Sequence, residues 1–546
     1  MLGYQAELAQ DMERAIREYE AALQTDPAAV SIKARLAVLY YSMGDLAMAV
    51  RYAEEAAQGQ GLDGQMFSQL AGVYAGAGQQ ERALTLFDRA IQTDPDKSDP
   101  YFSKGLLLLN LKRVADAEQT IREGIKLAPD SAVGYYNLGR VGVESKQFDA
   151  AIKHFERAIA VNPSFEPAYL ALGTLHEARQ EREKAVSVYR RYLDGINPRN
   201  REIRQHLVRL FITAKEYQAA LTELEQMLAE DPDDLDAQLR VSLMYGELKE
   251  YPKAIERLQK ILAVRPAELK VRDYLGYLFE EKKEHEKAIE AYEFNLKLEP
   301  TYFEGHLHLG VLLYRLKRIP ESIAHLREAT TLSPKQPESH IVLGLAYLQS
   351  DQFEMASQAF EEGIRFNPKN ADLHFNLGTA YDKLNRFDDV VRAMEMALQL
   401  DPHHADALNY LGYSYADRGI KVEEALALTK QAVALKPDNG YYVDSLGWAF
   451  YKMGRIDEAL TEIKRAVALV GDDPVIFEHL GEIYLRQDLL HEAREAWLHS
   501  LELDPSNTKL IERFRERGMG DPAQEERVRR AVRRVSEQKA AHQATP

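Results

Sequence analysis

The sequence predicts an all-α solenoid of about 15 helical hairpins, and three observations support this prediction. Proline recurs almost every 34 residues. Two amphipathic stretches lie between successive prolines, as in 133–145 and 148–161, and each is too small to bury its apolar face alone. Small residues also recur at two fixed places in each period. The repeated prolines are Pro95, Pro129, Pro163, Pro198, Pro232, Pro266, Pro300, Pro334, Pro368, Pro402, Pro437 and Pro505.

Within each period, the first helix carries a small residue and the second helix carries an alanine. If the proline is position 32, then position 8 is glycine in Gly105, Gly139, Gly173, Gly276, Gly310, Gly344, Gly378, Gly412, Gly447 and Gly481. Position 20 is alanine in most units, including Ala83, Ala117, Ala151, Ala185, Ala288 and Ala459. Paired helices approach closely at such positions, where larger side chains overpack the contact. Aromatic residues four positions after the alanine, such as Phe155, Tyr189 and Trp497, fill the remaining space. Proline then ends the second helix.

These positions resemble those of the tetratricopeptide repeat (TPR) family. The resemblance implies a right-handed TPR superhelix over residues 1–505, whose first helices line a concave groove that binds proteins. Gly61 and Gly471 stand in place of two prolines, and a spacing of 35 before Pro198 and Pro437 indicates insertions near Gly195 and within 418–423. Such insertions are tolerated at turns.

The two ends depart from the repeat. Gly3 aligns with position 8, so the first repeat is truncated, and we expect either further sequence upstream, such as a signal peptide, or a misassigned start codon. Residues 506–518 are expected to form a capping helix. Residues 519–546 form a basic tail that is expected to be flexible; the helical spacing of Val528, Val532 and Val535 leaves docking on a partner as the alternative.

Composition argues against several functions. With 69 basic and 86 acidic residues the net charge is −17, which opposes binding to nucleic acid. There is no cysteine for disulfides or thiolate metal sites, and no apolar run long enough to cross a membrane. Phosphate-loop and HExxH motifs are absent, and the adjacent His403 and His404 lack a third ligand. The sequence therefore predicts no catalytic residue, no cofactor and no metal site.

The candidate partner-binding residues are aromatic side chains at positions 2, 5, 9 and 12 of the first helices, or directly beside them. The densest group is Tyr410, Tyr413, Tyr441, Tyr442, Trp448 and Tyr451, called the aromatic cluster below; the others are Phe102, Tyr136, Tyr277 and Phe375. The alternative for the aromatic cluster is packing between repeats. Acidic residues recur at position 2, as in Glu304, Glu338, Asp372 and Asp406, where they either complement the helix dipole or steer a basic partner.

Residues 408–505 resemble a more specific group of proteins within this family. The runs LNYLGYSYADRGIKVEEAL, YYVDSLGWAFYKMGRIDEAL and PVIFEHLGEIYLRQ resemble the carboxyl-terminal repeats of Gram-negative outer-membrane TPR lipoproteins that act as adaptors for a carboxyl-terminal processing protease. This resemblance implies a non-catalytic periplasmic adaptor that holds the protease and its cell-wall hydrolase substrates together. The alternatives are an assembly factor for an exopolysaccharide export or secretion machine, and a cytoplasmic chaperone-docking TPR protein. No lipid-carrying cysteine is present, so membrane attachment depends on a missing N-terminal lipoprotein signal.

Overall fold

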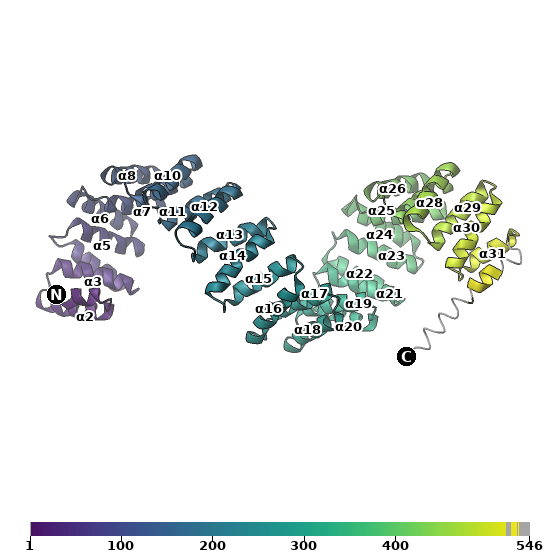
Figure 1. Cartoon of the computed structure of the whole chain (residues 1–546), viewed down its shortest axis with the longest axis horizontal. Helices are drawn as coiled ribbons and strands as arrows, with labels where there is room; N and C mark the ends of the chain where they lie inside the picture. Colours follow the sequence, from purple (N-terminus) through teal and green to yellow (C-terminus); the bar gives the residue numbers. More distant parts are fainter. Residues whose placement is uncertain (1, 520–525, 532, 534–546) are drawn as a thin grey trace. The chain divides into compact units, whose positions relative to one another are not determined.

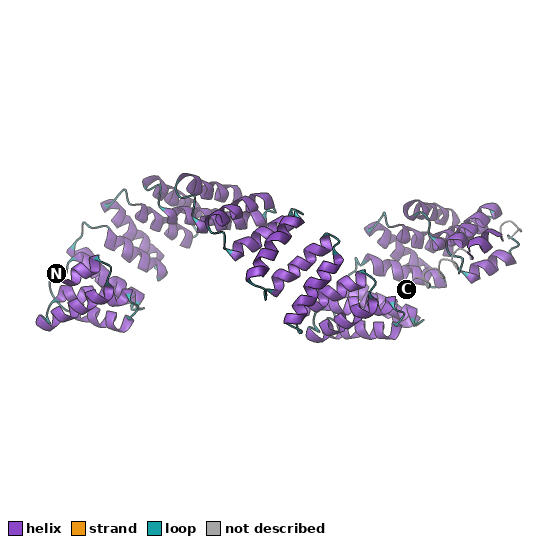
Figure 2. Cartoon of the chain, turned by 60° about the horizontal axis from the view of Figure 1, so that its bottom comes forward, coloured by secondary structure: helices purple, strands orange, loops and turns teal. Residues whose placement is uncertain are grey.

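The computed structural model describes residues 2–519, 526–531 and 533 (Figure 1). Within these residues all regular secondary structure is helical (Figure 2), which confirms the predicted all-α repeat solenoid. Two compact units, Met1–Ile261 and Leu262–Pro546, divide the chain, and each is described by itself. The predicted domain limits at 505 and 518 stay predictions.

The helices of the first half are α1 Leu2–Leu8, α2 Met12–Thr25, α3 Val30–Ser42, α4 Leu46–Ala57, α5 Gly64–Gly76, α6 Gln80–Thr93, α7 Asp99–Asn110, α8 Val114–Leu127, α9 Ala132–Glu144, α10 Phe148–Val161, α11 Glu166–Ala178, α12 Arg182–Gly195, α13 Arg201–Thr213, α14 Tyr217–Glu230, α15 Leu235–Glu247 and α16 Tyr251–Val264. Those of the second half are α17 Leu269–Glu281, α18 His285–Leu298, α19 Phe303–Arg315, α20 Ile319–Leu332, α21 Pro337–Gln349, α22 Phe353–Phe366, α23 Ala371–Lys383, α24 Phe387–Leu400, α25 Ala405–Arg418, α26 Val422–Leu435, α27 Gly440–Lys452, α28 Ile456–Val470, α29 Pro474–Arg486, α30 Leu490–Leu503 and α31 Thr508–Glu516.

The glycine at position 8 lies directly against a large side chain of the paired helix. A Cβ atom added to Gly139 lies 2.3 Å from Phe155 Cε1, and one added to Gly173 lies 2.2 Å from Tyr189 Cε1. Gly481 is placed in the same way against Trp497. These distances leave no space for a side chain at position 8. The predicted close approach of the two helices is thus confirmed.

The proline turn between hairpins is held by a side chain six residues further along the chain. The Pro266 carbonyl oxygen accepts a hydrogen bond from the Arg272 guanidinium at 2.5 Å, and the Pro334 carbonyl accepts one from His340 Nε2 at 3.0 Å. Tyr101, Tyr169, Arg204, Gln238, His306 and His374 make the same contact in other repeats. Proline therefore ends one helix while its carbonyl anchors the next first helix.

The short turn inside each hairpin contains a left-handed residue that the sequence pattern did not reveal. Gly44, Gly78 and Gly454 adopt this conformation in three hairpins. Residues with side chains adopt it, with φ between 57° and 63°, at Lys112, Lys146, Gln180, Lys215, Lys249, Lys283, Lys317, Asp351, Asn385 and Asp488. In the loop with the predicted insertion, both Gly419 and Lys421 are left-handed.

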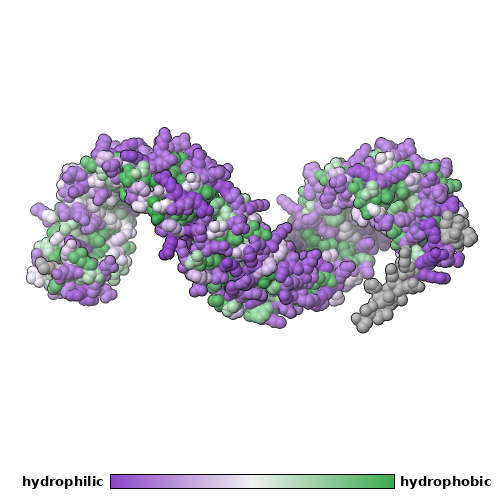
Figure 3. Space-filling view, in the orientation of Figure 1, coloured by the Kyte–Doolittle hydropathy of each residue, from purple (hydrophilic) through white to green (hydrophobic). Residues whose placement is uncertain are grey.

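Buried side chains lie between successive helices, whereas hydrophilic residues cover most of the visible outer surface of each unit (Figure 3). At the C-terminal end, Leu510 and Phe514 of α31 pack with Trp497 of α30. Residues 526–531 are helical, and Val528 is buried in the same cluster while Arg527 pairs with Glu502 at 2.8 Å. The apolar side of this short helix packs against the end of the core, and the flexibility of the tail stays a prediction. Val532 and Val535 lie outside the described residues.

Candidate functional site

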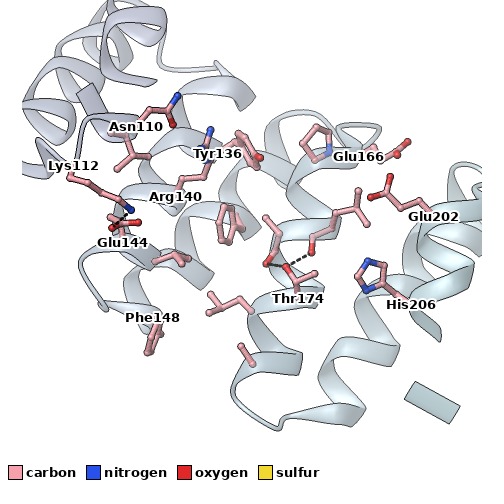
Figure 4. A pocket seen from close by; sticks show the side chains of 18 residues that line it. Asn110, Lys112, Tyr136, Arg140, Glu144, Phe148, Glu166, Thr174, Glu202 and His206 are labelled. Atoms are coloured by element: carbon pink, nitrogen blue, oxygen red, sulfur yellow. Dashed lines mark hydrogen bonds and ion pairs between the residues drawn. The ribbon is translucent and has the colours of Figure 1, made fainter. Parts of the chain in front are cut away.

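First helices of successive hairpins line a hollow of about 910 Å³ in the first unit (Figure 4). Tyr136 and Arg140 come from α9, Glu166 from α11, and Glu202 and His206 from α13. The hollow lies where the repeat pattern places the exposed side of the first helices. Tyr136, a predicted contact residue, is part of its wall.

Neighbouring aromatic rings hold Tyr136 in place. Its ring meets Phe165 edge-on at 5.6 Å and lies 5.9 Å from Phe155, so it is only partly accessible. At one end of the hollow, the Lys112 ammonium pairs with Glu144 at 2.7 Å (Figure 4). The lining carries both signs of charge, which gives the hollow no strong preference for a partner's charge.

Phe102 was predicted to face a partner, and this prediction is wrong. Its side chain is only 5% exposed. Added Cβ atoms on Gly124 and Gly134 would each lie 2.8 Å from the Phe102 ring, so the two glycines create the space that the ring fills. The two glycines, which stand 22 and 32 residues further along the sequence, were the signal for this burial.

A second hollow, of about 480 Å³, lies between the first helices α17, α19 and α21 of the second unit. Tyr277 is 48% exposed there, and its ring stacks at 5.9 Å on that of Tyr274. The structure therefore places this predicted contact residue at an accessible position.

The aromatic cluster is built around Trp448 on α27. Its indole ring stacks on Tyr451 at 4.7 Å and on His479 of α29 at 4.0 Å, and its Nε1 donates to Asp417 at 3.3 Å. His479 Nδ1 in turn lies 2.9 Å from the carboxylate of Asp444. The ring is thus enclosed by side chains of three successive repeats.

Burial divides the aromatic cluster. Trp448 is 7% exposed and Tyr442 is 3% exposed, so their prediction as contact residues is wrong: packing between repeats encloses them. Tyr441 is 57% exposed, and Tyr410, Tyr413 and Tyr451 are half-buried. Phe375 is also half-buried, against His404 at 5.0 Å and Tyr410 at 6.2 Å.

Carboxylates surround the half-buried part of this cluster. Burial, together with the negative charge of Asp382, raises the pKa of Tyr410, and burial with the charge of Asp417 raises that of Tyr413. Both phenols therefore stay neutral and able to donate hydrogen bonds. Burial also raises the pKa of the Glu482 carboxyl. Arg513 of α31 forms ion pairs with Glu478 and Glu482 and closes this end of the cluster.

Two position-2 carboxylates bind the neighbouring repeat. Asp372 accepts a hydrogen bond from His404 Nε2 at 3.2 Å, and Asp406 accepts one from the Tyr442 hydroxyl. His404 also caps α25, since its Nδ1 accepts from the Ala407 N–H. Among the residues with described positions, no three His, Cys, Asp or Glu side chains are grouped to hold a metal ion. No helix in the described part of the chain is long and apolar enough to span a membrane.

Family profiles for the tetratricopeptide repeat match along this chain. One profile matches residues 69–132, 136–201, 275–337, 377–440 and 445–508, which is more than half of the chain. The chain belongs to the tetratricopeptide repeat family. Other TPR profiles match residues 30–60, 211–272 and 344–385.

Several TPR proteins are similar to parts of the chain. Anaphase-promoting complex subunit 3 of Schizosaccharomyces pombe is 24% identical over 179 residues, which is 33% of this chain and 27% of that protein. The human mitochondrial import receptor subunit TOM70 is 30% identical over 115 residues, 20% of this chain and 19% of its own. The chain thus spans less than a third of the length of these relatives.

Two solved structures are among those similar to the chain. The APC/C hetero-tetramer Cut9-Hcn1 has a chain that is 16% identical, with a TM-score of 0.38 and coverage of 91% of this chain and 95% of that one. Yeast Tom70 is 15% identical, with a TM-score of 0.34, and the match covers 79% of this chain and 99% of the Tom70 chain.

Proposed function

We propose that this TPR protein is a non-catalytic scaffold that binds partner proteins along its first helices. The observation that carries the proposal is that first helices line hollows with tyrosines in their walls: the partly accessible Tyr136 in the first unit and the exposed Tyr277 in the second. Such rings supply large contact areas at a small entropic cost. The names of the relatives, subunits of a complex and of an import receptor, support the same class of function.

The specific version that we favour is a periplasmic, outer-membrane-associated adaptor for a carboxyl-terminal processing protease and its cell-wall hydrolase substrates. It rests on the resemblance of residues 408–505 described above. A scaffold of this kind raises the local concentration of protease and substrate. Assembly of an export or secretion machine is the second candidate.

Chaperone docking in the cytoplasm is a weaker candidate. Chaperone-docking TPR proteins hold the terminal carboxylate of their partner with clustered lysine and asparagine side chains. Asn137 is buried, and the Asn376 amide donates to the Asp372 carbonyl of its own helix at 2.7 Å. Asn137 is therefore enclosed, and Asn376 already uses one of its two amide hydrogens within its own helix.

The test measures hydrolase degradation by purified protease at increasing concentrations of this chain. A scaffold gives a bell-shaped rate, because excess scaffold separates the two partners onto different molecules. The double variant Tyr410→Ala/Tyr441→Ala should lower the maximum, whereas Phe294→Ala, an exposed aromatic residue on the second helix α18, should leave it unchanged. A flat rate contradicts the protease version. Capture of export components from a lysate of the native organism supports the second candidate instead.

A further inference from the structure

The hollow between α17, α19 and α21 has a chemical character of its own. Asp273 and Tyr277 come from α17, Glu304 and His308 from α19, and Glu338 from α21. Three successive repeats therefore contribute to one site of about 480 Å³. This volume accommodates one long side chain together with part of the segment that carries it.

Negative charge dominates the lining. Five carboxylates, those of Asp273, Glu280, Glu281, Glu304 and Glu338, face two permanent cations, Lys270 and Arg315, and the imidazole of His308, so carboxylates outnumber cations even when His308 is protonated. One of the two cations is already used, since Arg315 is paired with Glu280, which also accepts a hydrogen bond from Tyr292 at 2.7 Å. The remaining balance favours a positively charged ligand.

Asp273 points to the same kind of ligand. Its Oδ2 lies 2.8 Å from His308 Nδ1 and forms an ion pair with the protonated imidazole. Its Oδ1 is buried and accepts no hydrogen bond from any residue that the structure describes. This oxygen has essentially no accessible surface, so a ligand in the hollow meets the negative charge of Asp273 and not the oxygen itself.

Tyrosine rings complete the wall. Tyr277 is 48% exposed and is stacked on Tyr274, while Tyr292 and Tyr302 also line the hollow. The face of an aromatic ring attracts cations, and a guanidinium additionally stacks on it because both are planar.

We propose that this hollow binds an arginine side chain in an extended, basic segment of a partner protein. The guanidinium stacks on Tyr277 and is attracted by the carboxylates of the lining, while Glu304 and Glu338 also attract the flanking basic residues. This inference rests on the proposed scaffold function and names the chemistry of one of its contacts.

The test uses fluorescein-labelled tetra-arginine amide as the probe, with binding to the full chain measured by fluorescence anisotropy at fixed ionic strength. Tyr277→Ala should weaken binding about fivefold through loss of the ring face. Glu304→Gln should weaken it about threefold. The first variant leaves the net charge unchanged, so general attraction to this acidic chain does not account for its effect.

Matched controls lie on the same hairpin but outside the hollow. Phe294→Ala removes an aromatic side chain of similar exposure, 44%, and Glu290→Gln removes one exposed carboxylate. Both controls should bind the probe as the wild type does. The inference is overturned if Tyr277→Ala binds equally well, if the controls weaken binding as much, or if tetra-glutamate or chitotetraose binds as tightly as the arginine probe.

Failure of this inference differs from failure of the proposed function. If the protease assay gives the bell-shaped rate but Tyr277→Ala does not change probe binding, the chain is a scaffold without this arginine site. If the chain binds the probe through Tyr277 but the protease rate stays flat, the arginine site is supported and the protease-adaptor version of the scaffold is contradicted.

Discussion

Two glycine-to-alanine substitutions in the first unit should change stability in opposite directions. Gly72 lies within α5, and no atom outside its own helix lies within 4 Å of an added Cβ. Gly173 lies within α11, where an added Cβ lies 2.2 Å from Tyr189 Cε1 and 2.4 Å from its Cζ. The backbone is helical at both positions, so the difference between the variants measures the helix contact alone.

The magnitudes follow from the two environments. Alanine stabilises a helix interior by roughly 0.5–1 kcal/mol relative to glycine, which is the whole effect expected for Gly72→Ala. For Gly173→Ala the same gain opposes an overpacking cost of about 1–3 kcal/mol. Tyr189 has little freedom to move away, because it is fully buried and its hydroxyl donates to Glu177 at 2.6 Å. We expect a net loss of about 1–2 kcal/mol.

Urea unfolding followed by circular dichroism gives the global effect, and hydrogen exchange of peptides from α11 and α12 gives the local one. Local measurement matters because neighbouring repeats of a solenoid open with different free energies. Replacing Tyr189 by leucine should reduce the cost of Gly173→Ala, since the ring is the clashing group. If Gly173→Ala stabilises the chain as much as Gly72→Ala does, the close contact at position 8 is refuted.

Three further predictions concern buried and titrating groups. Trp448→Ala should destabilise the second unit by about 3 kcal/mol because the ring is enclosed, whereas Tyr441→Ala should change stability by less than about 0.5 kcal/mol; equal melting curves for both would contradict the burial. Glu223→Gln should cost about 3 kcal/mol in urea unfolding, since it leaves the buried Arg204 guanidinium without its carboxylate; replacing both by apolar residues should recover much of the loss. The Asp273 carboxylate, which accepts from the His308 imidazole, raises the pKa of His308 above its ordinary 6.5, so the stability that this contact adds is complete below that value and is lost as pH rises through the raised pKa. The melting advantage of wild type over His308→Gln should therefore shrink as the pH rises above the ordinary histidine range, and an advantage that grows with pH would refute the assignment.

The sequence predicted the repeat well because its signals are local. The spacing of small residues along the chain fixes where two adjacent helices touch: in the structure Gly139 lies against Phe155 and Gly142 against Ala151. Burial at the outer side of a first helix depends instead on the next repeats. Phe102 is buried because glycines at 124 and 134 leave space, and Trp448 because His479 covers it. Such pairings over more than 20 residues are not visible in the pattern of a single helix.

The second hollow was missed as a site for a related reason. Its tyrosines stand at several different repeat positions, so they form no stripe in the sequence. Only the folded chain brings Tyr292 of a second helix beside Tyr277 of a first helix. A search for aromatic and acidic residues within one or two repeats of each other, regardless of position, would have found them.

The two aromatic sites of the second unit differ in how far their side chains are already bound. In the aromatic cluster, Trp448 donates to Asp417, and Arg513 neutralises Glu478 and Glu482. In the hollow of α17, α19 and α21, Tyr277 is 48% exposed. A partner that binds the cluster must first displace internal contacts, whereas one that enters the hollow meets an aromatic side chain that is already accessible. The hollow is therefore the better-prepared contact, even though the sequence made the cluster the more conspicuous of the two.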